Sequence, residues 1–193
     1  MARLPNITFE DIVIKARPFF WLRGYNGVTT EELAKHLEVS PSVLYKKYDK
    51  DMIFIGALES YIDTFTNPFL LGLKDTQEGI ETFREAFYGL ANVFMDKTFP
   101  RSCMLTNSIV EMHDNSNKEK VVQLYKHFMD CMKESFTFVL EKAYQLGEIR
   151  DASKIEQYAI FLSSTVFELT VFYKCKSKEE LRSYIDQQLE LLV

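Results

Sequence analysis

Glycine and proline are scarce in this chain of 193 residues, which contains seven glycines and five prolines. Both residue types interrupt regular helices, so their scarcity predicts long helical stretches with few turns. The three cysteines, Cys103, Cys131 and Cys175, are odd in number and far apart in the sequence. This spacing argues against a disulfide framework and favours a reducing compartment such as the cytoplasm.

The chain also lacks the long apolar segments of membrane and exported proteins. No stretch approaches the roughly 18 consecutive apolar residues of a membrane span, and the first residues, MARLPNITFED, lack the apolar core of a signal peptide. Hydrophobic residues nevertheless make up 47% of the chain and aromatic residues 14%, so a sizeable core is available. We therefore expect a soluble, cytoplasmic protein.

A surplus of positive charge is missing too. The formal net charge is -5. Residues 1–60 contain eight Lys or Arg and eight Asp or Glu, whereas the remainder contains 15 and 20, so only the C-terminal part is acidic. This balance argues against a protein that coats nucleic acid through bulk charge.

Sequence signatures of common catalytic sites are absent as well. The chain has no Gly-rich phosphate loop, no HExxH and no nucleophile elbow, and its three histidines belong to no recognisable triad. His127 and Cys131, with Glu134 near the same helix face, have the spacing of metal ligands, but no second pair accompanies them. Surface or packing roles explain them better, so we expect no metal, no cofactor and no enzymatic activity. Cys103, near a helix start, leaves a redox sensor open.

Apolar residues recur at helical spacing through almost the whole chain. This pattern predicts an all-α fold of about nine helices. The three short N-terminal helices are expected over residues 8–23, 29–37 and 41–48. Longer helices are expected near residues 50–66, 80–94, 101–113, 121–146, 153–175 and 177–192. The helix over 50–66 is apolar nearly all round, so we expect it to be buried on several sides.

Side-chain signals mark several helix ends. Gly24 is a plausible end of the first helix, and Ser40 is a good N-cap before Pro41 at a first helical position. Three pairs have the spacing of a capping box: Thr29 with Glu32, Ser153 with Glu156, and Ser177 with Glu180.

The stretch TTEELAKHLEVSPSVLYKKY, residues 29–48, contains two short helical patterns joined by four residues. It fits a helix-turn-helix, whose second helix lies in the major groove of DNA. Leu44 is expected to face inward, which leaves four polar residues outside: Ser42, Tyr45, Lys46 and Lys47. Hydroxyls and lysines bind phosphate oxygens. Short helix pairs also occur as plain packing units, so the spacing alone leaves DNA binding open.

Several residues around this stretch agree with a known family in order and spacing. They are Phe20, Gly24, Tyr25, Leu33, Ala34, Val39, Ser40, Leu44, Tyr45 and Tyr48. With these residues the segment 9–62 resembles the N-terminal domain of TetR/AcrR-family transcriptional regulators. RSCMLTNSIVEM, residues 101–112, looks like the start of the sixth helix in one branch of that family. The resemblance implies a helix-turn-helix DNA-binding domain over residues 1–49 and a ligand-binding and dimerisation bundle over residues 50–193.

The resemblance also implies a function and partners. Members are usually homodimers, most often repressors, that a small molecule bound in the C-terminal bundle releases from double-stranded operator DNA. No membrane contact is implied. On this basis we expect DNA contacts from Thr29, Thr30, Ser40, Ser42, Val43, Tyr45, Lys46, Lys47, Tyr48 and Lys50.

Two further sets of residues follow from the same resemblance. Aromatic, apolar and a few polar side chains are expected to line the effector pocket: Phe87, Phe94, Met104, Asn107, Glu111, Tyr125, Phe128, Met132 and Phe161. The last two helices are expected to form the dimer interface through Ile155, Ala159, Leu162, Val166, Leu169, Phe172, Leu181, Ile185 and Leu189. A second apolar face on the 153–175 helix contains Ile160, Phe167 and Val171, and internal packing of both faces is the alternative.

Three features depart from the family pattern. Glu38 stands where the family has glycine, and a positive φ there would cost glutamate about 1 kcal/mol or more. Pro18 falls inside the first helix, and Lys50 follows Tyr48 one residue too soon. Together with the neutral N-terminal charge, these departures keep an alternative open: a helical ligand- or protein-binding module of the same fold with weakened DNA affinity.

Overall fold

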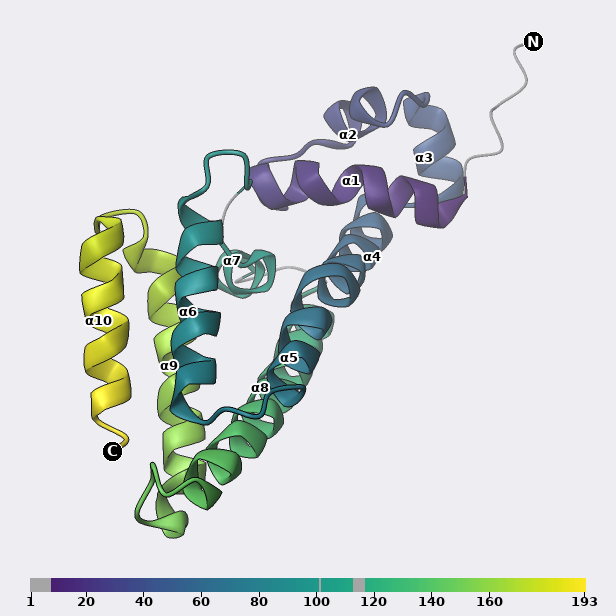
Figure 1. The fold of residues 1–193 in the computed structure, drawn as a ribbon. Coiled ribbons are helices and arrows are strands. Elements are labelled where there is room, and N and C mark those ends of the chain that lie inside the picture. The colour runs from purple at the N-terminus through teal and green to yellow at the C-terminus, as the bar shows by residue number, and fades with distance from the viewer. Residues whose placement is uncertain (1–7, 101, 113–116) are drawn as a thin grey trace. The chain divides into compact units, whose positions relative to one another are not determined.

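The computed structural model of the chain describes residues 8–100, 102–112 and 117–193, apart from the side chains of Val43 and Tyr45. The described residues form ten α-helices, one π-helix and one 3-10 helix, and they contain no strand (Figure 1). The all-α prediction is therefore confirmed. The sequence analysis did not predict helix α5 (Asn67–Lys74). None of the described helices is both long and apolar enough to cross a membrane.

The chain divides into two compact units. The first comprises Met1–Phe65 and Cys103–Tyr125, and the second comprises Thr66–Ser102 and Lys126–Val193. The first unit contains α1 (Phe9–Arg23), α2 (Thr30–His36), α3 (Pro41–Lys47), α4 (Lys50–Tyr61), most of the π-helix η1 (Ile62–Thr66), α7 (Met104–Glu111) and the start of α8 (Lys118–Gln145). The second contains α5, α6 (Ile80–Met95), the rest of α8, the 3-10 helix η2 (Ala152–Lys154), α9 (Ile155–Phe172) and α10 (Lys178–Glu190). The expected functional division at residue 49 stays a prediction.

Helix α1 begins at a capping box that the sequence analysis missed. Thr8 Oγ1 accepts a hydrogen bond from the backbone N–H of Asp11 (3.1 Å), and the Asp11 carboxylate accepts one from the backbone N–H of Thr8 (3.0 Å). The helix continues through Pro18 and ends at Gly24, as predicted. Its buried side packs on α4, in which residues 53–58 are all buried. This burial confirms the expectation for a helix that is apolar nearly all round.

Helices α2 and α3 lie beside α1 (Figure 1). The predicted capping box starts α2, because Thr29 Oγ1 accepts from the backbone N–H of Glu32 (3.1 Å) and the Glu32 carboxylate accepts from that of Thr29 (3.0 Å). Glu38, in the turn between the helices, has a φ of 58°. The turn therefore requires the left-handed conformation in which glycine would be unstrained.

The core of the second unit is aromatic. The Phe136 ring on α8 lies 5.2 Å from that of Phe83 and 6.0 Å from that of Phe87, both on α6. These side chains are buried, and they join α6 to the C-terminal part of α8. Helices α6, α9 and α10 run side by side in this unit (Figure 1).

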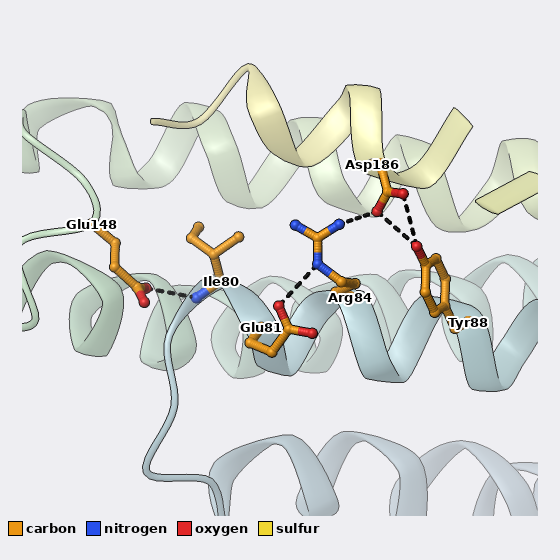
Figure 2. A network of polar contacts seen from close by, with 6 residues as sticks. All are labelled: Ile80, Glu81, Arg84, Tyr88, Glu148 and Asp186. Carbon is orange, nitrogen blue, oxygen red and sulfur yellow. Dashed lines mark hydrogen bonds and ion pairs between the residues drawn. The ribbon is translucent and has the colours of Figure 1, made fainter. Parts of the chain in front are cut away.

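Polar contacts fasten α10 to α6 (Figure 2). The Tyr88 hydroxyl is 2.8 Å from both carboxylate oxygens of Asp186. Arg84 forms an ion pair with Asp186 and a second one with Glu81 (2.9 Å). On the same unit, the Glu148 carboxylate accepts a hydrogen bond from the backbone N–H of Ile80 (2.8 Å), so it caps the start of α6.

The capping box expected at Ser153 and Glu156 is wrong. Asp151 is the cap instead, because its carboxylate accepts hydrogen bonds from the backbone N–H (3.0 Å) and the hydroxyl (2.6 Å) of Ser153. Glu156 forms an ion pair with Lys133 on α8. Asp151 and Lys133 therefore take the two groups, Ser153 and Glu156, that would otherwise have paired with each other. The capping box at Ser177 is confirmed, with hydrogen bonds of 2.7 and 3.2 Å to Glu180.

Candidate nucleic-acid interface

Helix α3 presents a polar face and buries an apolar one. Leu44 is only 1% exposed, as predicted, and its packing holds α3 to the first unit. Ser42, Lys46 and Lys47 are exposed on other faces of the helix. The exposed part of α3 therefore presents one hydroxyl and two ammonium groups, which are groups of the kind that contact phosphate oxygens.

The remaining expected DNA contacts around α2 and α3 have different surroundings. Thr29 is exposed, but its hydroxyl is engaged in the α2 cap, whereas Thr30 is half-buried. Ser40 is exposed at the N-cap position of α3 and makes no cap hydrogen bond; its hydroxyl lies 3.1 Å from that of Ser42. Tyr48 is half-buried, with its ring 4.9 Å from that of Phe9.

Val43 and Tyr45 have side chains outside the described part of the structure. Their backbone belongs to α3. Their role in DNA binding, like that of the other expected contact residues, stays a prediction.

Lys50 occupies a more enclosed position than its neighbours on α3. Its ammonium lies 3.9 Å from the centroid of the Tyr25 ring, a distance at which cation and ring attract each other. The Tyr25 hydroxyl in turn donates a hydrogen bond to Asp51. Burial lowers the pKa of Lys50, and the nearby carboxylates of Asp51 and Glu111 oppose that shift. Lys50 therefore helps to hold the first unit together, and its expected contact with DNA stays a prediction.

Glu111, at the end of α7, is fastened to the end of α1. Its carboxylate accepts hydrogen bonds from the backbone N–H groups of Tyr25 (3.0 Å) and Asn26 (2.6 Å). A Cβ atom at Gly24 would lie 2.5 Å from the same carboxylate, so glycine is required there for close approach as well as for its φ of 75°. Glu111 was expected to orient an effector. The structure places its oxygens on the backbone that precedes α2, and an effector contact stays a prediction.

Three other expected effector residues also lie in the first unit. Met104 is buried, and Asn107 and Tyr125 are half-buried. The Asn107 side-chain nitrogen is a buried atom that has no hydrogen-bond partner among the described residues. Burial raises the pKa of Tyr125 to about 12. A buried amide without a partner is the kind of group that orients a ligand in an otherwise apolar site.

Tyr61 is a residue of this region that the sequence analysis missed. It is buried on α4, and burial raises the pKa of its hydroxyl, which also faces the buried thiol of Cys103. No sequence signal distinguishes this tyrosine from the other apolar residues of α4. Only the packing of α4 against α7 brings the hydroxyl and the thiol together.

The remaining expected effector residues belong to the second unit. Phe87, Phe94, Phe128 and Met132 are buried, and Phe161 is half-buried. The Phe94 ring lies 5.9 Å from that of Tyr173 on α9, and Phe87 packs on Phe136. Core packing accounts for the burial of these side chains, and their contact with a ligand stays a prediction.

The residues expected at the dimer interface are mostly covered within the chain. Seven of them are buried: Ala159, Leu162, Val166, Leu169, Leu181, Ile185 and Leu189. Ile155 and Phe172 are half-buried, and the Phe172 ring packs on Tyr184 of α10 at 5.3 Å. These side chains are occupied in packing within the second unit. The other apolar face of α9 is the open one, because Ile160 is 55% and Val171 is 56% exposed.

His127 and Cys131 lie in contact on α8, with 3.7 Å between the thiol sulfur and Nε2 of the ring. Among the residues that the structure describes, no group of three or more His, Cys, Asp or Glu side chains is placed to hold a metal ion.

Comparison with known proteins points to the segment that contains α2 and α3. Residues 12–50 match the family model for bacterial regulatory proteins of the tetR family. The chain is 23% identical over 194 residues to the uncharacterised HTH-type transcriptional regulator YezE of Bacillus subtilis (strain 168), covering 97% of this chain and 98% of that protein. It is 23% identical over 170 residues to the HTH-type transcriptional repressor ComR of Escherichia coli (strain K12), covering 86% and 80%.

Solved structures share the whole fold. A cysteine mutant of the TetR family transcriptional regulator CifR, complexed with a 26bp double-strand operator DNA, superposes with a TM-score of 0.82 at 19% identity and full coverage of both chains. The transcriptional regulator FadR of Bacillus subtilis, in complex with stearoyl-CoA, gives a TM-score of 0.67 at 17% identity, covering 96% of this chain and 98% of that one. The likeness therefore extends from the helix-turn-helix through the C-terminal helices.

Proposed function

We propose that this chain, whose residues 12–50 match the family model for bacterial regulatory proteins of the tetR family, is a ligand-responsive DNA-binding transcriptional regulator, specifically a repressor that a small molecule releases from its operator. The exposed polar face of α3 carries this proposal. Leu44 anchors the helix, and Ser42, Lys46 and Lys47 are exposed where DNA would approach. In a helix-turn-helix this second helix enters the major groove.

The lysines of α3 determine how binding should respond to salt. Each ammonium that neutralises a phosphate releases condensed counterions, so affinity falls as the salt concentration rises. Because residues 1–60 have no net positive charge, only local contacts of this kind are available to attract the duplex. We therefore expect modest non-specific binding and a specific complex that depends on the α3 contacts.

Helix α7 supplies a route from the effector to the DNA-binding helices inside the first unit. Asn107 and Glu111 are four residues apart and share a helix face. An effector that bonds to the unpaired Asn107 amide would shift α7 and with it the grip of Glu111 on Tyr25 and Asn26. The complex of the similar protein FadR with stearoyl-CoA supports a small-molecule effector in this fold. The coupling between effector and operator would be about 1–3 kcal/mol.

A second copy of the chain would complete the DNA-reading unit. We place the contact on the open face of α9, where Ile160 and Val171 are exposed, together with the adjoining part of α10. A two-fold dimer presents two α3 helices to half-sites about 34–36 Å apart, or to a multiple of that spacing. We place the protein in the cytoplasm, where its DNA target would be.

Fluorescence anisotropy with the DNA upstream of its own gene tests the proposal. The purified protein is titrated against this labelled duplex and against a scrambled one, at about 50 and about 200 mM salt. We expect tight binding to the upstream duplex that weakens steeply at the higher salt concentration. Equal, weak binding to both duplexes, followed by failure of a selection from random genomic fragments, would rule the proposal out.

The neutral charge of residues 1–60 and the strained Glu38 favour one alternative. It is a helical ligand- or protein-binding module that keeps the fold but has weakened DNA affinity. In that case no duplex is selected from the genomic fragments.

A further inference from the structure

A groove runs between α5 and α6 on the second unit, and its lining residues are not among those considered so far. Its volume is about 610 Å³, within the range of small-molecule sites. Most of its wall is apolar, and the main contributors are Phe69 and Leu73 from α5 and Leu90 and Val93 from α6. Val93 is 39% exposed, so the groove presents apolar surface to the outside.

Two glycines line this groove. Gly72 on α5 and Gly89 on α6 both line it, and a Cβ atom added at either position would meet nothing within 4 Å. Glycine within a helix costs roughly 0.5–1 kcal/mol relative to alanine. Neither glycine has a positive φ that would require it. Neither sterics nor backbone conformation therefore requires glycine at these positions, and a larger side chain at either one would enter the groove.

The groove has one polar end. Helices α5 and α6 are consecutive and are joined by residues 75–79, so the end of α5 and the start of α6 lie at the same end of the groove. Asp75, Thr76, Thr82 and Glu85 line it there. From Glu85 to Val93 the α6 wall then rises over eight residues, or about 12 Å.

No basic side chain among the described residues neutralises the two carboxylates at the polar end. Neither Asp75 nor Glu85 has an ion pair or a side-chain hydrogen bond among the described residues. The basic residues next to them in sequence are engaged elsewhere: Lys74 with Glu134 (2.6 Å) and Arg84 with Glu81 and Asp186 (Figure 2). The two hydroxyls are also satisfied, since those of Thr76 and Thr82 are 2.8 Å apart.

We propose that this groove is a binding site for a cationic amphiphile, with its positive group between Asp75 and Glu85 and its apolar chain along the glycine-lined wall. The charge at one end and the apolar wall beyond it fit a molecule of that polarity. An anionic ligand would meet two negative charges, and a wholly apolar one would gain nothing from these two exposed carboxylates. The site is separate from the residues proposed for DNA and effector binding, so it stands or falls independently of them.

Isothermal titration calorimetry on the full chain tests the site. The probes are dodecyltrimethylammonium, which is cationic, and dodecyl maltoside, which is neutral. Both contain the same dodecyl chain, and each is kept below its critical micelle concentration. We expect saturable binding of the cation to one site and binding of the neutral probe that is about tenfold weaker, because two carboxylates attract the ammonium. No saturable binding of the cation would overturn the proposal.

Variants locate the binding. Gly89→Leu places a side chain in the groove and should weaken both probes at least about tenfold; Asn92→Leu, which adds the same side chain to an exposed position of α6 outside the groove, should leave both unchanged. Asp75→Asn with Glu85→Gln should abolish the preference for the cation, whereas Glu119→Gln with Glu190→Gln, which removes the same charge from exposed positions, should preserve it.

Three results would contradict the assignment. Unchanged affinity in Gly89→Leu would place the binding elsewhere. A preference for the cation that survives loss of Asp75 and Glu85 would refute their role. If Gly89→Leu changes the molecular mass measured by light scattering, a second copy of the chain occupies the groove instead.

Discussion

Glu111 accepts a hydrogen bond of 3.0 Å from the backbone N–H of Tyr25, a residue 86 positions earlier in the chain. The contact fixes the end of α7 on the turn that leads from α1 to α2. Since Asn26 donates to the same carboxylate (2.6 Å), one side chain satisfies two consecutive backbone donors. The position of α7 and the start of the helix-turn-helix are therefore linked by a single residue.

Loss of this carboxylate should destabilise the protein. Glu111→Ala removes the acceptor of a part-buried backbone donor at Tyr25 and of an exposed one at Asn26, which should lower the free energy of unfolding by about 1–2 kcal/mol. Gly24→Ala should also be destabilising, because of its φ of 75° and the contact of its new Cβ with Glu111. In the double variant the contact is absent, so Gly24→Ala should cost less than it does in the natural sequence.

Urea unfolding of the four proteins in this cycle provides the measurement. Gly89→Ala serves as a matched control, because its Cβ meets nothing within 4 Å and should stabilise α6 by roughly 0.5–1 kcal/mol. Strict additivity of Gly24→Ala and Glu111→Ala would show that the two residues do not act through one contact.

Replacement of Glu38 by glycine should stabilise the protein. At a φ of 58° the left-handed conformation costs a glutamate about 1–2 kcal/mol, and glycine removes this strain. The greater conformational freedom of glycine in the unfolded chain offsets part of the resulting stabilisation. We expect a net increase of about 0.5–1 kcal/mol in the free energy of unfolding. The same change at Lys35, inside α2, should lower it by a similar amount. A loss of stability in Glu38→Gly would mean that the turn is not strained in solution.

Lys46→Ala should weaken operator binding and leave thermal stability unchanged, because its side chain is exposed on α3. Removing one phosphate contact should also reduce the slope of log affinity against log salt concentration by about 1. Lys120→Ala, at an exposed position of α8 in the same unit, is the control for the loss of one charge. Equal effects of the two substitutions on the salt slope would exclude a specific role for Lys46.

Charges on the open face of α9 should produce monomers. Ile160→Glu with Val171→Glu adds charge to two side chains that are more than half exposed, so the fold should persist while a subunit contact is lost. Leu169→Glu places a charge at a position that is 0% exposed and should unfold the second unit instead. Light scattering after size exclusion, with circular dichroism, separates the two outcomes. If the variant with both Ile160→Glu and Val171→Glu remains a dimer, the interface lies on another surface.

Stability at high pH should depend on Tyr125. Burial raises the pKa of its hydroxyl to about 12, so the folded protein holds this proton more tightly than the unfolded chain does. The resulting stabilisation is complete below pH 10 and declines as the pH rises from 10 to 12, by less than about 1.4 kcal/mol per pH unit. Tyr125→Phe should make the decline shallower, as judged by urea unfolding across this range. Tyr144→Phe, an exposed tyrosine on α8, is the control and should not.

Local signals in the sequence were enough for most helix boundaries. The capping boxes at Thr29 and Ser177, the helix end at Gly24 and the inward face of Leu44 were all predicted and are all present. Each depends on neighbours within a few residues, so the sequence specifies the partner directly. The prediction at Ser153 was wrong because Asp151, two residues upstream, accepts from Ser153, and because Lys133, on another helix, pairs with Glu156.

Local signals did not predict which residues of the candidate sites are buried. Periodicity marks Leu169 and Ile160 equally as apolar residues of one helix, yet one is fully buried and the other is 55% exposed. Likewise Glu111 and Asn107 share a face, but only one of them meets the turn after α1. Spacing says which side chains point the same way. It does not say which of them another part of the chain will cover.

The sequence by itself determined the all-α class, the helix-turn-helix and the position of its second helix, since helical periodicity and capping act within about four residues of each other. Only the tertiary structure decided which apolar face of α9 stays open, that Glu111 holds the backbone at Tyr25, and that Gly72 and Gly89 leave a groove between α5 and α6. These features arise between segments that are distant in the chain or on separate helices, where contact depends on how whole helices pack.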